Sequence, residues 1–262
     1  MPTALTIAGS DSGGGAGIAA DLKVFSALGV YGTCAITAVT AQNTRGVTAQ
    51  AALEPSLVAA QIRAVLEDIG AAAVKTGMLA NGDIVGAVAQ ELARWRPPHL
   101  VVDPVVRAST GAELLTEQAL EALKRQLLPL AEVITPNLPE AEALVGRALT
   151  SEADIRDAAR EMLDLGCRAV VVKGGHRSGP ADDVLFDGQA FDVLHAERLD
   201  APFTHGTGCT FSAALTAELA KGADLFSAAR SAKVFVTEAI RHGFPIGQGH
   251  APVHHLWNVW PA

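Results

Sequence analysis

Short apolar runs alternate along most of the chain with longer segments in which apolar residues recur every three or four positions. The short runs predict strands over residues 5–8, 33–39, 73–76, 100–102, 133–135 and 169–173. The longer segments predict helices over residues 17–27, 56–68, 84–94, 117–127, 140–145 and 152–165. Strands that are apolar along their whole length and separated by helices are typical of a parallel sheet covered on both faces. The pattern therefore predicts an α/β fold.

The C-terminal third departs from this alternation. Residues 183–194 predict an antiparallel hairpin around the Asp187-Gly188 turn, and two long helices are expected over residues 207–220 and 225–241. The segment after Gly243 is rich in glycine and proline and predicts irregular structure. Because no repeat or linker divides the chain, we expect residues 1–262 to form a single domain.

Polar or glycine-rich residues follow the predicted strands. They are Gly9-Ser10-Asp11, Thr40-Ala41-Gln42-Asn43, Thr76-Gly77-Met78, Asp103, Asn137 and Gly174-Gly175. In open α/β sheets, ligands bind where the carboxyl ends of strands meet the N-termini of helices. We therefore expect the functional site at this edge of the sheet.

Composition and charge exclude several classes of protein. The 262 residues carry 20 Lys and Arg against 28 Asp and Glu, and no basic tract, which argues against nucleic acid or an anionic membrane as partner. No apolar stretch reaches the roughly 20 residues of a membrane-spanning helix, and the first residues lack the features of a signal peptide. The three widely spaced cysteines, Cys34, Cys167 and Cys209, form no disulfide framework or metal motif. We therefore expect a cytoplasmic protein.

The segment HGTGCTFSAAL, residues 205–215, is the richest candidate for chemistry. Gly206, Thr207 and Gly208 lead into an apolar helix, and glycine allows the close backbone approach that an anion at a helix N-terminus needs. Cys209 lies in the first turn, where the positive end of a helix lowers the pKa of a thiol, so it could act as a base toward a substrate hydroxyl. The alternative is a glycine-kinked turn with a buried cysteine.

A second glycine-rich segment, AGSDSGGGAGIAADLK at residues 8–23, joins the first predicted strand to a helix. It matches neither the Walker A pattern nor the spaced G-x-G-x-x-G of dinucleotide folds. A ligand-binding loop and a flexible connection both remain open, because five glycines between Gly9 and Gly17 are costly to order.

Four polar residues near strand ends carry two interpretations each. Asn137 and Glu140 could hold a hydrated Mg²⁺, but their spacing at a helix start favours a capping box. Lys173 ends an apolar strand, so either an anionic ligand or an acidic neighbour must compensate its charge. For Asp103, a metal-binding or base role competes with loop capping.

Together these segments resemble the hydroxymethylpyrimidine/phosphomethylpyrimidine kinases of thiamine biosynthesis, a family of the ribokinase-like superfamily. The resemblance covers nearly the whole chain. Its most specific blocks are the first and last, LTIAGSDSGGGAGIAADLKVFSALGVYG and HGTGCTFSAAL; AITAVTAQNT, VKTGML, VVDPVV, ITPNLPEAEAL and VVVKGGH lie between them in the family's order. It implies a three-layer α/β/α fold with a central, mostly parallel sheet. It also implies ATP-dependent phosphorylation of 4-amino-5-hydroxymethyl-2-methylpyrimidine to its monophosphate and then to the diphosphate.

The resemblance further implies roles for individual residues. Gln42 would pair with the edge of the pyrimidine through its amide, and the residues that shape the pocket around the ring would be Gly9, Ala16, Asp21, Thr40, Met78 and Val105. Gly206, Thr207 and Gly208 would form the anion hole, with Cys209 in the position of the catalytic base. The remaining implied roles are contacts to ATP by Lys173, Asn137 and Thr207, support of Mg²⁺ by Glu140 and Asp103, and a neighbouring position for His205 and Lys233.

One position separates branches of the superfamily: most members resemble G-T-G-D, with an aspartate as the base, whereas this chain has Cys209, as the pyrimidine-kinase branch does. At another position this chain departs from its relatives, because Thr110-Gly111 stands where they often have Ser-Gly. A pyridoxal or pyridoxine kinase and a non-catalytic nucleotide-binding module of the same fold are the alternatives. Relatives imply a homodimer that acts on small molecules.

Overall fold

A central sheet organises the computed structural model, which describes residues 1–105, 116–175 and 179–260. Within these ranges eight strands lie in the order β10-β9-β8-β7-β6-β5-β1-β2. Their bounds are β1 Thr3–Ala8, β2 Tyr31–Ile36, β5 Ala73–Thr76, β6 His99–Val102, β7 Val133–Ile134, β8 Ala169–Val172, β9 Asp183–Phe186 and β10 Phe191–Leu194. Six neighbouring strands of this sheet run parallel, namely β2, β1, β5, β6, β7 and β8, and β9 and β10 are antiparallel additions at one edge. The expected mostly parallel sheet is confirmed.

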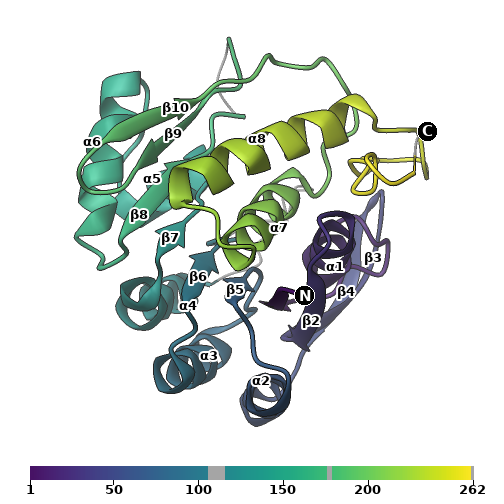
Figure 1. The fold of residues 1–262 in the computed structure, drawn as a ribbon, viewed down its shortest axis with the longest axis vertical. Coiled ribbons are helices and arrows are strands. Elements are labelled where there is room, and N and C mark those ends of the chain that lie inside the picture. Colours follow the sequence, from purple (N-terminus) through teal and green to yellow (C-terminus); the bar gives the residue numbers. More distant parts are fainter. Residues whose placement is uncertain (106–115, 176–178, 261–262) are drawn as a thin grey trace.

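Helices cover both faces of this sheet, which gives three layers (Figure 1). The layer on one face contains α2 Pro55–Asp68, α3 Gly82–Trp95, α4 Glu117–Ala122, the helical turns η1 Leu123–Leu127 and η2 Leu128–Leu130, α5 Leu138–Val145 and α6 Glu152–Leu163. The opposite layer contains α1 Gly17–Ala27, α7 Thr207–Ala220 and α8 Leu225–Arg241. The bounds of α1, α7 and α8 are those that the periodicity predicts.

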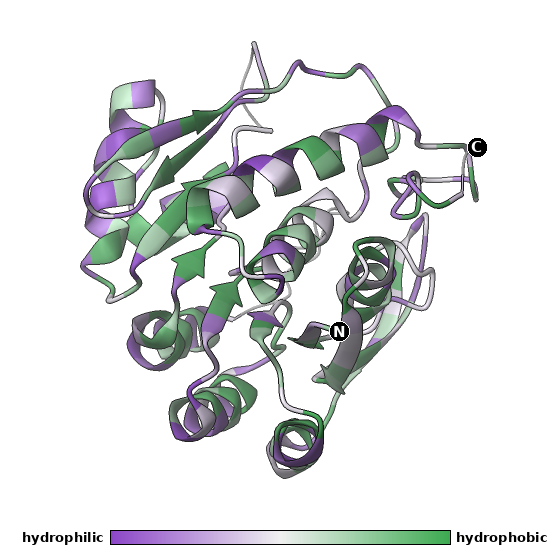
Figure 2. Cartoon of the chain, in the orientation of Figure 1, coloured by the Kyte–Doolittle hydropathy of each residue, from purple (hydrophilic) through white to green (hydrophobic). Residues whose placement is uncertain are grey.

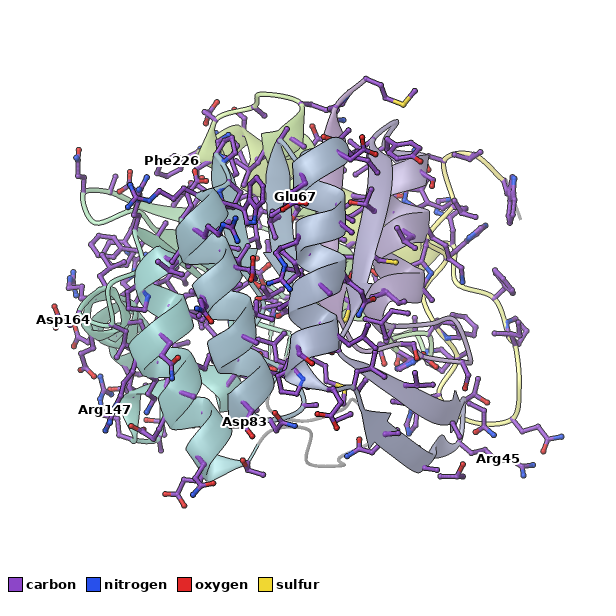
Figure 3. The ribbon with its side chains drawn as sticks, turned by 90° about the horizontal axis from the view of Figure 1, so that it is seen from below. Arg45, Glu67, Asp83, Arg147, Asp164 and Phe226 are labelled. Carbon is purple, nitrogen blue, oxygen red and sulfur yellow. The ribbon has the colours of Figure 1, made fainter. Side chains whose placement is uncertain are left out.

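Two hydrophobic cores form because successive strand residues point to opposite faces. In β1, Leu5 and Ile7 join the core beneath α2 and α3, whereas Ala4 joins the core beneath α1 and α7. Figure 2 shows the apolar strands between helices whose outer surfaces are more polar. Figure 3, from below, shows the charged residues Glu67 and Asp83 on the helices of the first layer.

Residues 33–39 do not form the single strand that the sequence predicts. β2 ends at Ile36, and a separate antiparallel pair follows, made of β3 Ala38–Asn43 and β4 Gly46–Ala52. This hairpin stands beside α1, away from the main sheet, with Arg45 at its tip (Figures 1 and 3). The pattern missed β4 because its sequence, GVTAQAA, is largely exposed and lacks an apolar alternation. Gln42 therefore lies on a strand and not in a loop after one.

Other expectations from the pattern are confirmed. The Asp187-Gly188 turn joins β9 to β10, and the segment after Gly243 contains no helix or strand in its described residues. No helix in the described ranges has the length and apolar character needed to cross a membrane.

Candidate active site

A cavity of about 850 Å³ lies along the carboxyl edge of the parallel strands, as expected. Its wall includes residues within three positions of the ends of β1, β5, β6, β7 and β8, namely Gly9, Met78, Asp103, Asn137 and Lys173. Because these strands are neighbours in the sheet, the order of the residues along the cavity follows from the order of the strands. The volume lies within the usual range of small-molecule sites and leaves room for more than one ligand group.

The N-terminus of α7 enters this cavity in its middle. Gly206 has φ +81°, and a Cβ on it would lie 1.8 Å from the carbonyl oxygen of Gly15, so only glycine fits there. A Cβ on Gly208 would lie 3.2 Å from Lys173 Nζ, which places the helix start between the glycine-rich loop and Lys173. No described side chain caps α7, and the Thr207 amide donates to the Thr204 carbonyl at 3.3 Å, so the other first-turn amides, those of Gly208 and Cys209, are available to an anion.

Lys173 and Asp103 form an ion pair next to this helix start. The Lys173 Nζ lies 3.0 Å from Asp103 Oδ1, and the Ser212 hydroxyl lies 3.1 Å from Asp103 Oδ2. Burial, the largest single effect, lowers the pKa of the Lys173 ammonium, but Asp103 and Glu140 together outweigh burial, so this pKa is raised. The ammonium is therefore charged and lines the cavity, so the ion pair and a contact to an anionic ligand are compatible interpretations of Lys173.

Cys209 lines the same cavity as Gln42. Burial raises the pKa of the Cys209 thiol to about 11, although Lys75 acts in the opposite direction. The expectation of a lowered thiol pKa is therefore wrong for this structure, because the loss of water around the sulfur outweighs the positive end of α7.

Asp11 orders the glycine-rich loop, which is not a flexible connection. Its carboxylate accepts hydrogen bonds from the amides of Gly13 at 2.8 Å, Gly15 at 3.1 Å and Ala16 at 3.0 Å. His205 Nε2 lies 2.9 Å from Asp11 Oδ2 and joins this network. The sequence placed Asp11 at a strand end without a role, although an aspartate that begins a glycine run is a signal for such a turn.

The residues expected around the pyrimidine separate into two groups. Gly9, Ala16, Gln42, Met78 and Val105 line the cavity. Asp21 and Thr40 are buried behind its wall and do not appear in it.

Thr40 instead supports residues of the wall, whereas Asp21 pairs with a lysine that does not line the cavity. The Thr40 hydroxyl donates to the Ser10 carbonyl at 2.8 Å and lies 3.3 Å from Gln42 Oε1. Asp21 Oδ1 lies 2.6 Å from Lys75 Nζ, and both side chains are fully buried. Sequence reasoning missed Lys75, although a lysine within an apolar strand requires a partner in the way Lys173 does.

Asn137 and Glu140 form the capping box that their spacing favours. The Glu140 amide donates to Asn137 Oδ1 at 2.9 Å, and the Asn137 amide donates to Glu140 Oε2 at 2.8 Å. Both residues also line the cavity, so capping fixes the Glu140 carboxylate at its wall. A carboxylate on a fixed helix start fits Mg²⁺, which binds few protein oxygens and keeps water or phosphate ligands. Asp103 fits less well, because its oxygens contact Lys173, Thr135 and Ser212.

The far end of the cavity, beside β8 and β9, contains a second buried pair. Lys233 on α8 is 2.8 Å from Asp183 Oδ2, and the Gly174 amide donates to Asp183 Oδ1 at 2.8 Å. Apolar residues of α8, Val236 and Ile240, line this end. Thr110-Gly111 lies outside the described residues.

This geometry is suited to group transfer between two ligands. An amide-rich helix start and a lysine can stabilise negative oxygens, with room for one ligand on each side. Residues 11–254 match the phosphomethylpyrimidine kinase family.

Individual relatives agree with this match. The chain is 52% identical over 257 residues to a hydroxymethylpyrimidine/phosphomethylpyrimidine kinase from Haemophilus influenzae. The aligned residues cover 96% of this chain and 95% of the relative. Its structure is similar to an ADP complex of Bacillus subtilis pyridoxal kinase, with TM-score 0.91, 43% identity and 97% of each chain covered. It is also similar to a phosphomethylpyrimidine kinase from Clostridium difficile, with TM-score 0.82, 44% identity, and 92% of this chain and 100% of that chain covered.

These likenesses confirm the ribokinase-like fold and a kinase that uses ATP. Because the family matches most of this chain and a relative is 52% identical to it, this chain belongs to the phosphomethylpyrimidine kinase family.

Proposed function

We propose that this protein transfers the γ-phosphoryl group of ATP to the hydroxymethyl oxygen of 4-amino-5-hydroxymethyl-2-methylpyrimidine, and then phosphorylates the monophosphate to the diphosphate. One observation carries the proposal: Gln42 and Cys209 line a single cavity, and the start of α7 lies between the glycine-rich loop and Lys173. An amide side chain both donates and accepts hydrogen bonds, which suits the edge of an aminopyrimidine.

The order of the strands supports a position for each ligand. Gly9, Gln42 and Met78 lie at the β1 and β5 end, which is the proposed pyrimidine end. Lys173 follows β8 at the opposite end, where Val236 and Ile240 offer apolar contacts to a nucleotide base. The γ-phosphoryl group would then lie at the start of α7, in contact with the amides of Gly206–Cys209 and the ammonium of Lys173.

Phosphoryl transfer depends mainly on positioning and charge stabilisation. The hydroxymethyl oxygen forms the new bond to phosphorus while the bond to the β,γ-bridging oxygen breaks and ADP leaves. Cys209 is proposed to accept the hydroxyl proton late in this step. Only the thiolate of Cys209 can accept this proton. With a thiol pKa of about 11, the thiolate is a small fraction of the resting protein at neutral pH, so the base role requires that the sulfur ionises before the transfer.

Asn137, Thr207 and Glu140 complete the proposed nucleotide end. Asn137 and Thr207 offer polar groups to the phosphates, and the Glu140 carboxylate would hold Mg²⁺ together with phosphate oxygens and water. When bound, Mg²⁺ neutralises phosphate charge. Asp103 is proposed to act indirectly, through its ion pair with Lys173.

Turnover with alternative alcohols tests the proposal. Release of ADP is measured with the pyrimidine alcohol, with pyridoxal and without an acceptor, and the products are identified by mass. We expect one and then two added phosphoryl groups on the pyrimidine. Nucleotide binding without turnover of either alcohol would instead support a non-catalytic module.

Pyridoxal phosphorylation is the second candidate, because a Bacillus subtilis pyridoxal kinase has nearly the same fold as this chain. The ratio of kcat/KM for the two alcohols distinguishes the candidates. A preference for pyridoxal above tenfold would reverse the assignment.

The proposal treats residues 1–262 as one kinase domain that forms a homodimer in the cytoplasm. All three cysteines are free thiols, which fits a reducing compartment. The β3–β4 hairpin offers a surface for a second copy, because β4 is largely exposed and Val39 is 50% exposed. Light scattering should give a molar mass of about twice 27.0 kDa, and the Val39→Asp substitution should lower this mass toward that of the monomer.

A further inference from the structure

His205 joins three segments that are far apart in the sequence. Its ring contacts Asp11 in the glycine-rich loop, with Nε2 and Oδ2 2.9 Å apart. Its own amide donates to the Ala251 carbonyl at 3.3 Å, and the Val253 amide donates to the His205 carbonyl at 3.2 Å. The next residue along the chain is Gly206, where the proposed anion hole begins. Asp11 and His205 are both buried, at 6% exposure each.

The two loops that His205 connects are in direct backbone contact. A Cβ on Gly206 would lie 1.8 Å from the Gly15 carbonyl oxygen, and a Cβ on Gly15 would lie 2.5 Å from His205 Cδ2. No side chain fits between the loops, so any shift of one displaces the other. The position of the α7 amides therefore depends on the position of the glycine-rich loop.

Asp11 fixes the loop side of this contact. Burial would raise the pKa of its carboxyl, but His205 and the loop amides hold it below its ordinary value, so the carboxylate is ionised at neutral pH. An ionised acceptor makes stronger hydrogen bonds than a neutral one, which rigidifies both the loop and its link to His205.

The C-terminal segment extends the same link to Gln42. The amides of Gln248 and Gly249 donate to Thr44 Oγ1 at 3.2 Å each, and the His250 amide donates to the Thr44 carbonyl at 2.7 Å. Thr44 lies in the turn of the β3–β4 hairpin, two residues after Gln42. One segment thus holds both His205 and the hairpin that carries Gln42, which Figure 1 shows beside α1 and β3.

We propose that Asp11 and His205 are positioning residues that hold the amides of the anion hole in register with the pyrimidine end of the cavity. This inference rests on the proposed function. Neither residue needs to touch the reacting atoms. A displacement of about 1 Å at the start of α7 is enough to lower the rate about 100-fold, because phosphoryl transfer requires aligned reactants.

His205→Gln and His205→Asn test the inference as a matched pair. The amide nitrogen of Gln reaches about as far as imidazole Nε2, whereas that of Asn ends one atom short. We expect His205→Gln to keep kcat within about threefold of the wild type and His205→Asn to lose at least tenfold. The KM values for ATP and for the pyrimidine alcohol should each change less than threefold in both variants.

A transition-state mimic separates positioning from general destabilisation. ADP with aluminium fluoride, in the presence of Mg²⁺, should inhibit His205→Asn more weakly by about the factor that kcat loses, while ADP alone binds as in the wild type. His99→Asn is the control, because His99 also pairs with a carboxylate, Glu132 at 2.6 Å, but lies at the opposite edge of the sheet. It should leave kcat unchanged.

Each outcome supports or overturns the inference. Equal kcat in both His205 variants and the wild type would overturn it while the proposed function stands. Equal loss in both variants, with no selective loss of the aluminium fluoride complex, would also overturn it. If the wild-type protein does not phosphorylate the pyrimidine alcohol, the proposed function fails, and the inference fails with it.

Discussion

Lys173 Nζ lies 3.0 Å from Asp103 Oδ1, and the two residues come from the ends of β8 and β6, 70 positions apart in the sequence. The pair lies next to Gly208, where the helix amides and the ammonium can contact the same anion. The Lys173 ammonium, which the strand pattern leaves unexplained, thus compensates the charge of Asp103 and also makes this part of the cavity positive.

Lys173→Gln should therefore affect both stability and nucleotide affinity. It leaves the buried Asp103 carboxylate without its counter-ion, which costs about 3 kcal/mol of unfolding free energy. We also expect the KM for ATP to rise at least tenfold. Urea unfolding and steady-state kinetics measure the two effects. Lys173→Arg retains the charge and should recover most of the stability; an unchanged KM for ATP in Lys173→Gln would contradict the phosphate contact.

The reactivity of Cys209 should depend steeply on pH. Because burial raises the pKa of this thiol to about 11, the thiolate fraction rises about tenfold for each pH unit between pH 7 and pH 10. The rate of iodoacetamide modification, followed at each cysteine by peptide mass spectrometry, should rise in parallel. Cys167, whose thiol pKa is raised to about 12 by burial, serves as a slower internal reference. A plateau below pH 9 would show that the thiol pKa is lower.

Cys209→Ala should lower kcat more than it raises KM. The proposed proton transfer to sulfur occurs only during the chemical step, so its loss does not weaken the ground-state complex. We expect a fall in kcat of about 100-fold, at the lower end for loss of a general base. Saturation kinetics with each substrate give the comparison, and an unchanged kcat would refute a base role for Cys209.

Gln42→Ala should weaken binding of the pyrimidine and leave ATP unaffected. Loss of hydrogen bonds worth about 1–3 kcal/mol corresponds to a rise of about 5- to 150-fold in the KM for the pyrimidine alcohol. Gln50→Ala is a matched control, because Gln50 lies on β4 opposite Thr40 and is exposed. Equal loss of affinity for both substrates in Gln42→Ala would contradict the proposed pyrimidine end.

Glu140→Gln should separate metal binding from helix capping. Glutamine accepts the same hydrogen bond from the Asn137 amide, so the melting temperature should change little. The Mg²⁺ concentration for half-maximal activity should rise about tenfold, because a neutral amide binds Mg²⁺ more weakly. Asp154→Asn, in the exposed capping box of α6, is the control and should leave the Mg²⁺ requirement unchanged. An unchanged requirement in Glu140→Gln would exclude Glu140 as a ligand.

Local pattern was sufficient to predict the helices and the edge of the sheet at which the cavity lies. The bounds of α1, α7 and α8 follow from apolar periodicity, and Gly206 and Gly208 marked a helix start open to an anion. The capping box of Asn137 and Glu140 also follows from spacing alone. In each case the relevant contacts join residues within a few positions of one another, so the sequence contains the information directly.

Contacts between distant segments decided the rest. The partner of Lys75 is Asp21, 54 positions away, and Asp11 meets His205 across 194 positions. The thiol pKa of Cys209 likewise depends on how much protein surrounds the sulfur, which a helix start does not reveal. Burial and charge pairing are properties of the packed molecule, because they depend on which side chains exclude water from a site. For this protein the sequence by itself determined the elements and the edge where they converge. Only the tertiary structure decided which charges meet there and which groups remain neutral.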